Sequence, residues 1–204
     1  MLQLIRAVFL AIRWQLAVAF SVIVPAWPAL AVDLDGTVWE SAARTEGDLD
    51  PLLLYAIALT ESGRPDGEGR IKPWPWALNV EGKALFAGTK EEAIALLETY
   101  RGRSVDVGLL QVNTRWHGHR VQDLVSLLDP ETNLTVGARI LKEALNASPG
   151  DLTAGIGRYH SGRQDRARRY ARIVVRIYQY LLPLLSKTFP VGQICPHSRR
   201  HVRA

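Results

Sequence analysis

The chain has 204 residues, 22% of them charged, and a net charge of +5. Without the first 31 residues the net charge falls to +3, which is compatible with a polyanionic surface but too weak to argue for a nucleic-acid partner. The single cysteine, Cys195, excludes an internal disulfide, so stability has to come from packing and the thiol is free or pairs with another chain. We expect no metal site and no cofactor, because the five histidines are scattered and lack metal-ligand spacing. They are His117, His119, His160, His197 and His201.

The first 31 residues are predicted to be a secretory signal peptide. Arg6 and Arg13 give a positive start, an apolar stretch follows, and Ala29-Leu30-Ala31 has the small-x-small form of a cleavage site. A retained membrane anchor is the alternative. Cleavage after Ala31 removes two arginines and leaves 23 basic and 20 acidic residues, a net charge of +3. The remaining chain of about 170 residues is long enough for one domain with its own core.

The first predicted helix leads from Asp50 to Glu61. Asp50 is the expected N-cap and Pro51 the first helical residue, where the missing N–H needs no partner. The helix is apolar and ends on a carboxylate, which Ser62 and Gly63 follow at once. Desolvation by apolar neighbours would raise the pKa of Glu61, so that it holds a proton near neutral pH as a general acid must. The alternative is a solvated glutamate at a helix end.

The stretch 63–105 mixes proline, glycine and tryptophan and is predicted to contain a β-hairpin. The hairpin is expected within residues 74–86, with its turn near Glu81-Gly82. Four more helices are predicted from start signals in the rest of the chain. They are a helix after the capping box of Thr89 and Glu92 that ends at Gly102, a helix from Asp129-Pro130 that ends before Pro149, a helix from Asp151 to about His160, and an amphipathic helix at 166–182.

Four short motifs follow one another along the chain. They are Ala58-Leu59-Thr60-Glu61-Ser62-Gly63, Val107-Gly108-Leu109-Leu110-Gln111-Val112, the run 129–141 that begins Asp129-Pro130-Glu131-Thr132-Asn133, and Arg158-Tyr159-His160-Ser161-Gly162. In this order they resemble the soluble lytic transglycosylase (SLT) domain of the lysozyme-like superfamily, over about residues 49–177. The resemblance implies a mainly α-helical, lysozyme-like domain with a small β-hairpin insertion. We expect this domain at 32–188 and a basic, disordered tail at 189–204.

The resemblance also implies a reaction in the periplasm, the cleavage of the MurNAc–GlcNAc β-1,4 bond of peptidoglycan. Family members use one glutamic acid, which corresponds here to Glu61, to protonate the glycosidic oxygen. The resulting carboxylate then helps to remove the proton of the muramic C6 hydroxyl, which attacks C1 and leaves a 1,6-anhydro end. Ordinary glycosidases need two carboxylates, whereas here the second nucleophile belongs to the substrate.

Two other functions remain open at this point. A hydrolytic lysozyme of the goose-like kind needs a further acid that activates water, and Asp66, Glu68 and Asp106 are the candidates because they lie between the first two motifs. A catalytically silent assembly factor that only grips peptidoglycan or a partner is the other alternative. The intact set of motif residues argues against this second alternative.

Substrate-binding roles are implied for residues that match family positions. Gln111 matches a glutamine whose amide faces the sugars, and Tyr159 matches an aromatic residue whose hydroxyl lies near the acid. A solvated glutamine and a core tyrosine are the alternatives. Asn133 is expected either to contact substrate or to make internal hydrogen bonds. Ser62, beside the acid, and His160 complete the set.

His160 and two glycines call for separate comment. His160 stands where the family commonly has asparagine, so an imidazole either changes a hydrogen bond or adds a titrating group near the acid. An ordinary helix-terminal histidine is the alternative. Gly108 and Gly137 are expected at positions of permissive backbone or close packing, without chemistry of their own.

The long stretch 63–105 resembles an insertion found in a subgroup carried by conjugative and integrating elements. This resemblance predicts local wall opening during assembly of a conjugation or secretion apparatus, with components of that apparatus as partners. Trp74, Trp76 and Phe86 either stack on sugar rings or belong to the core. A basic cluster could meet anionic peptide stems or a membrane surface, or be a solvated helix face. It consists of Arg163, Arg166, Arg168, Arg169 and Arg172.

Overall fold

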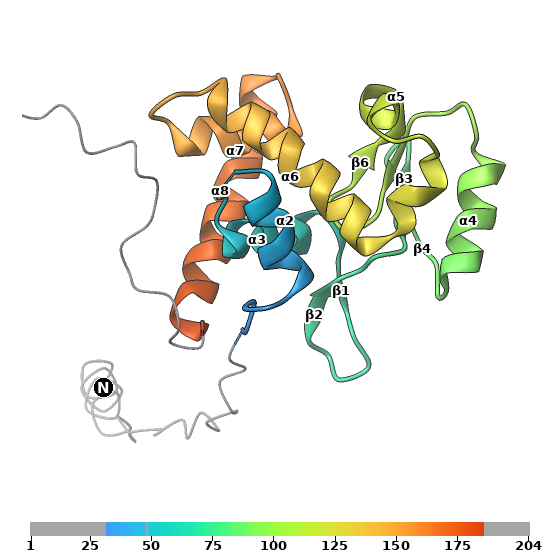
Figure 1. The fold of residues 1–204 in the computed structure, drawn as a ribbon, viewed down its shortest axis with the longest axis horizontal. Helices are drawn as coiled ribbons and strands as arrows, with labels where there is room; N and C mark the ends of the chain where they lie inside the picture. Colours follow the sequence, from blue (N-terminus) through green and yellow to red (C-terminus); the bar gives the residue numbers. More distant parts are fainter. Residues whose placement is uncertain (1–31, 48, 186–204) are drawn as a thin grey trace, which may run out of the picture. The chain divides into compact units, whose positions relative to one another are not determined.

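A computed structural model describes residues 32–47 and 49–185 (Figure 1). They form a mainly helical domain with two small antiparallel sheets, which confirms the predicted fold class. The predicted signal peptide, the basic tail and Cys195 lie outside the described residues. In the described part of the chain, no helix has the length and apolar character needed to span a bilayer.

Four of the predicted helices begin where the sequence signals placed them, and the last begins at Gln164, two residues before the predicted start. Asp50 accepts the N–H of Leu52 at 2.8 Å, and Asp129 and Asp151 cap their helices in the same way. Two helices, α2 and α5, were not predicted. The described residues contain α2 (Val38–Thr45), α3 (Pro51–Ser62), α4 (Lys90–Thr99), α5 (Thr114–His117), α6 (Pro130–Asn146), α7 (Leu152–His160) and α8 (Gln164–Leu181), with short 3₁₀ turns η2 (Gly118–Arg120), η3 (Leu124–Leu128) and η4 (Leu182–Leu184).

The start of α4 differs in detail from the predicted capping box. Thr89 Oγ1 accepts the N–H of Glu92 at 3.1 Å, as expected. The Glu92 carboxylate, however, accepts the N–H of Gly88 at 2.7 Å, so the returning bond of the box goes one residue further back. The helix ends at Thr99 rather than at Gly102, which lies in the turn that follows.

The predicted hairpin is confirmed and forms part of a larger sheet. Strands β3 (Ala77–Val80) and β4 (Lys83–Phe86) pair antiparallel across the turn Glu81-Gly82, where both residues have positive φ, as a type I′ turn requires. Strands β5 (Val105–Val107) and β6 (Val112–Asn113) extend it to the order β4-β3-β5-β6. A second hairpin, β1 (Gly63–Pro65) with β2 (Ile71–Pro73), follows α3 directly.

The core consists of two hydrophobic clusters that meet at α6. The helices α2, α3, α7 and α8 gather on one side of α6, and the four-stranded sheet with α4 lies on the other (Figure 1). In α6, Leu134 and Leu141 belong to the helical cluster, whereas Val136 and Ile140 belong to the sheet cluster. Helix α6 therefore contributes apolar side chains to both clusters and holds the other helices against the sheet.

The loop between β5 and β6, residues 108–111, crosses from one cluster to the other. Val107 and Val112 at its ends are buried in the sheet cluster, and Leu109 and Leu110 at its centre are buried in the helical cluster. This position brings the loop to the end of α3, where the Ser62 hydroxyl contacts the Leu109 carbonyl. The functional site is built at this junction.

Candidate active site

Glu61 is a mostly buried carboxyl group in the last turn of α3. Its side chain is 14% exposed. The pKa of Glu61 is raised to about 7, mainly by burial; the Tyr170 hydroxyl lowers it and the charge of Asp106 raises it, and both act less strongly than burial. The expected rise is therefore present, and its main cause is desolvation. A carboxylic acid with this pKa exists in both protonation states near neutral pH, which suits a group that must donate a proton and then accept one.

Tyr170, which sequence reasoning missed, closes the site from α8. Its ring is buried, and its hydroxyl has no partner that meets full hydrogen-bond geometry among the described residues, although it acts on the Glu61 carboxyl to lower its pKa. Burial and the charge of Glu61 both raise the pKa of the Tyr170 phenol, so it stays neutral. A neutral hydroxyl beside the acid can orient either protonation state of the carboxyl.

His160 is a half-exposed neighbour of the acid. Its Nδ1 is 3.9 Å from Glu61 Oε1, beyond hydrogen-bond distance, and its ring stacks on Tyr170 with centroids 4.5 Å apart and planes 3° from parallel. Burial lowers the pKa of His160, Asp106 opposes this change and Arg166 adds to it. A neutral imidazole at neutral pH leaves the raised pKa of Glu61 in place.

Asp106 is the second carboxyl group whose charge reaches Glu61. It lies on β5, and burial raises its pKa, while a hydrogen bond from Asn113 Nδ2 at 2.7 Å lowers it. The other two candidate acids are engaged elsewhere. Asp66 pairs with Arg70 and Lys72, and Glu68 is an exposed partner of Arg70.

Two of the expected substrate-binding residues are buried and support the structure instead. Asn133 accepts the N–H of Leu110 at 2.8 Å and donates to the carbonyls of Val107 at 2.8 Å and Leu127 at 2.9 Å. The Ser62 hydroxyl lies 2.8 Å from the Leu109 carbonyl. Both residues are 1% exposed. Both side chains are therefore internal, and for Asn133 this matches the alternative of internal hydrogen bonds.

Tyr159 and Gln111 also bond to the loop 108–111. The Tyr159 hydroxyl donates to the Leu110 carbonyl at 2.7 Å, and its ring stacks on Tyr170 with centroids 6.5 Å apart. Glu61 is near enough for its charge to raise the pKa of Tyr159. Gln111 Nε2 donates to Gly108 O at 2.9 Å and to Ala77 O at 3.1 Å. The amide nitrogen of Gln111 is therefore directed into the protein.

Gly108 and Gly137 fit the same loop by having no side chain. Gly108 has a φ of 80°, and a Cβ there would overlap the Asn133 amide. A Cβ on Gly137 would overlap the Leu110 side chain. The expectation of permissive backbone at the first position and close packing at the second is confirmed.

The aromatic residues of the long insertion are only partly available. Trp76 packs against the sheet cluster, and its indole N–H is buried without a partner among the described residues. Trp74 is half-buried, donates its indole N–H to Ala87 O at 2.8 Å and meets Trp76 edge to face. Phe86 is 44% exposed, and Trp116, which sequence reasoning did not single out, is 69% exposed.

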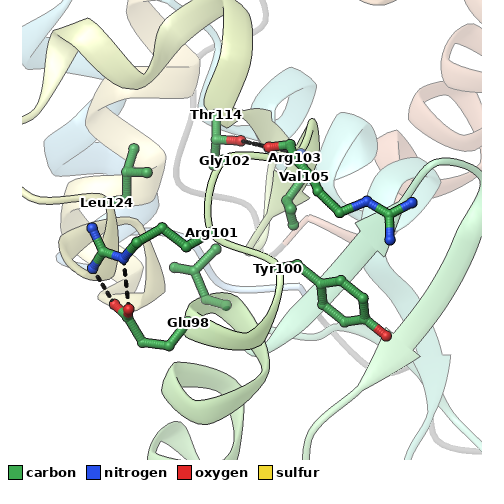
Figure 2. A pocket seen from close by; sticks show the side chains of 9 residues that line it. Glu98, Tyr100, Arg101, Gly102, Arg103, Val105, Thr114 and Leu124 are labelled. Atoms are coloured by element: carbon green, nitrogen blue, oxygen red, sulfur yellow. Dashed lines mark hydrogen bonds and ion pairs between the residues drawn. The ribbon is translucent and has the colours of Figure 1, made fainter.

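A small cavity elsewhere in the domain is unrelated to this site. It lies where α4 passes into β5, beside the ion pair of Arg101 with Glu98 and the contact of Thr114 with the Arg103 carbonyl (Figure 2). Its volume of about 10 Å³ holds at most one water molecule. Neither Glu61 nor its neighbours line it.

Comparison with known proteins places the site within a family. The profile of the family described as Transglycosylase SLT domain matches residues 38–173. No curated protein and no solved structure matches the chain. The matched range begins with α2 and includes the four sequence motifs together with Glu61, Asp106 and Tyr170.

Proposed function

The chain belongs to the Transglycosylase SLT domain family, which acts on peptidoglycan glycan strands, and we propose that it is a lytic transglycosylase with Glu61 as its acid and base. The family implies this activity. The observation that supports catalysis by this chain is the burial of Glu61 at the end of α3, which raises its pKa to about 7.

In the proposed first step, protonated Glu61 donates its proton to the oxygen of the MurNAc–GlcNAc bond as that bond breaks. In the second step the carboxylate takes the proton of the muramic C6 hydroxyl, whose oxygen forms the new bond to C1. The proton balance closes, because Glu61 returns to its acid form and the product carries a 1,6-anhydro ring. A pKa of about 7 places the group near the midpoint between donor and acceptor at neutral pH.

Tyr170 and His160 are proposed to position this acid. The Tyr170 hydroxyl acts on the Glu61 carboxyl, and His160 stacks on the tyrosine ring. The loop 108–111 is proposed to form a fixed wall beside Glu61, since side chains from three separate places in the chain, Ser62, Asn133 and Tyr159, bond to its backbone. We therefore propose that Gln111 and Tyr159 shape the site, because both side chains bond to this loop.

Hydrolysis is the second candidate, and Asp106 is the observation that favours it. Of the three acids considered from the sequence, Asp106 is the one whose charge acts on Glu61. An ionised Asp106 would activate water for attack on C1. Burial raises the pKa of Asp106, however, and so disfavours the base form that this role needs. We therefore favour the lytic reaction.

Product analysis tests both candidates. Residues 32–204 and the variant Glu61→Gln are incubated with purified peptidoglycan, and released muropeptides are identified by mass spectrometry. Anhydro ends from the wild type, with release lowered by about 10²-fold or more in the variant, are expected from loss of a general acid. Reducing ends would establish hydrolysis. Binding without release by the wild type would show that the protein is a silent assembly factor.

The biological setting of the reaction is a separate and more specific proposal. We propose export to the periplasm and local opening of the wall for an envelope-spanning conjugation or secretion apparatus. The resemblance of the stretch 63–105 to the insertion of the conjugative subgroup supports this setting, as does the secretory pattern of the first 31 residues. A strain without this protein that assembles its apparatus at the normal rate would contradict the proposal.

A further inference from the structure

Arg64 is held between two aromatic rings next to the proposed active site. It is the middle residue of β1, and its guanidinium carbon lies 4.4 Å from the ring centre of Trp74 and 5.4 Å from that of Phe86. Trp74 directly follows β2 and Phe86 is the last residue of β4, so separate segments converge on one cation. Such cation–π contacts fix the guanidinium group without neutralising its charge.

The charge of Arg64 has no acidic partner among the described residues. No carboxylate there lies within ion-pair distance of it, and its N–H groups make no hydrogen bond within that part of the chain. Its basic neighbours differ, because Arg70 and Lys72 both pair with Asp66. A half-buried guanidinium with free N–H groups presents a rigid fork that matches a carboxylate in geometry and charge.

The position of Arg64 relative to Glu61 is set by the backbone. The two lie three positions apart in sequence, so their Cα atoms are at most about 11 Å apart. The aromatic platform is tied to the same place, since the Trp74 backbone N–H donates to the Ser62 carbonyl at 3.1 Å. Arg64 and its aromatic platform therefore belong to the segment that directly follows the acid.

We propose that Arg64 binds a free carboxylate of the peptide stem on a muramic acid residue near the scissile bond. This inference rests on the proposed function, because that function makes peptidoglycan the ligand. The intact glycan backbone is uncharged, whereas its peptide stems carry free carboxylates, so a lone cation beside the acid recognises the stem. The guanidinium covers part of the Trp74 ring. In this proposal Trp74 is therefore a platform for Arg64 and not a surface on which sugars stack.

Steady-state kinetics on two substrates test this site. The first substrate is glycan strands with native stems, and the second is the same strands after carbodiimide coupling of the stem carboxylates to methylamine. Arg64→Gln is expected to raise KM about tenfold on native strands, as loss of a charge-assisted hydrogen bond of about 1.4 kcal/mol predicts, with kcat changed less than twofold. On the coupled strands the wild type and the variant are expected to have equal KM.

A matched control is Arg103→Gln. Arg103 also lies over an aromatic ring, with its guanidinium carbon 5.7 Å from the ring centre of Tyr100 (Figure 2), but Glu81 neutralises its charge. This variant is expected to keep the wild-type KM on both substrates. An Arg64→Gln variant that matches the wild type on native strands would overturn the proposal. Equal weakening on both substrates would also overturn it and assign Arg64 a structural role.

Binding in a Glu61→Gln background separates this proposal from the proposed function. Cosedimentation with native and with coupled sacculi is measured for Glu61→Gln alone and with Arg64→Gln added. If the added Arg64→Gln change lowers binding to native sacculi but not to coupled sacculi, stem recognition is supported. This holds even if the wild type releases no product. Retained binding by the double variant on native sacculi contradicts the Arg64 site, whatever the outcome of the product analysis.

Discussion

The loop 108–111 and the segment 63–86 both lie beside Glu61, but they are held in different ways. The loop is fixed by side chains that bond to its backbone, among them Asn133 and Tyr159. The segment is held by two hairpins and an aromatic cluster, and it leaves Arg64 without an acidic partner among the described residues. The difference fits the two proposals, in which the loop sets the shape of the site and the segment binds the peptide stem through Arg64.

The largest effect is expected when the support of the loop is removed. Asn133→Ala leaves the N–H of Leu110 and the carbonyls of Val107 and Leu127 buried without partners. Buried unsatisfied groups cost about 1–3 kcal/mol each, so we expect the free energy of unfolding to fall by about 3 kcal/mol or more. Urea unfolding followed by circular dichroism measures this change.

Asn146→Ala is the matched control for this variant. Asn146 is exposed at the end of the same helix, α6, so its replacement is expected to change the free energy of unfolding by less than about 0.5 kcal/mol. Equal unfolding midpoints for Asn133→Ala and the wild type would show that the loop does not depend on the Asn133 amide.

Removal of the acid itself is expected to stabilise the fold at high pH. The pKa of Glu61 is raised from 4.5 to about 7, so the folded state binds the proton more tightly than the unfolded state. The corresponding stability is fully present below pH 4.5 and is lost as pH rises through 7. Glu61→Gln removes this dependence, and at pH 8 it should exceed the wild type by up to about 3 kcal/mol. Urea unfolding at pH 4 and pH 8 measures the difference, and a variant less stable than the wild type at pH 8 contradicts the buried acid.

A smaller loss of stability is expected when a side chain of the segment 63–86 is removed. Trp74→Ala removes a half-buried ring and its hydrogen bond to Ala87 O, which should lower the free energy of unfolding by about 1–2 kcal/mol. Trp74→Phe keeps a ring beneath Arg64, so its KM should stay closer to that of the wild type than the KM of Trp74→Ala. Global unfolding of Trp74→Ala would instead make this segment as essential to the fold as the loop.

The smallest expected effects are opposite shifts of the pH profile by two neighbours of the acid. Asp106 raises the pKa of Glu61 and Tyr170 lowers it. Because cleavage needs protonated Glu61, Asp106→Asn should move the alkaline limb of kcat/KM to lower pH, and Tyr170→Phe should move it to higher pH. Shifts in the same direction would show that at least one of the two residues does not act on Glu61 as described. Loss of all product in Asp106→Asn would favour the hydrolytic reaction.

Local signals in the sequence predicted most of the helices and the position of the acid. Asp50-Pro51 and Asp129-Pro130 mark helix starts because capping depends on a few adjacent residues. The Glu81-Gly82 turn was predicted for the same reason. Strands β5 and β6 were missed, since strands of two or three residues show no periodicity and pair with partners far along the chain.

Contacts between distant residues explain what was missed in the site. Tyr170 lies among arginines in sequence, and helical spacing with Val174 would have placed it on the buried face of α8. Nothing in that spacing shows that its hydroxyl meets Glu61, which is 109 positions away. Asn133 and Ser62 were recognised by their motifs, but only the structure shows that their partners are backbone atoms of the loop.

The most direct test of the proposed acid is an NMR titration of the Glu61 side chain. Carboxyl ¹³C shifts of glutamate-labelled protein are followed from pH 3 to pH 9, and the spectrum of Glu61→Gln assigns the resonance. The buried site predicts a midpoint near 7, well above those of exposed glutamates. A midpoint near 4.5 would mean that Glu61 is ionised at neutral pH and would contradict its role as the proton donor.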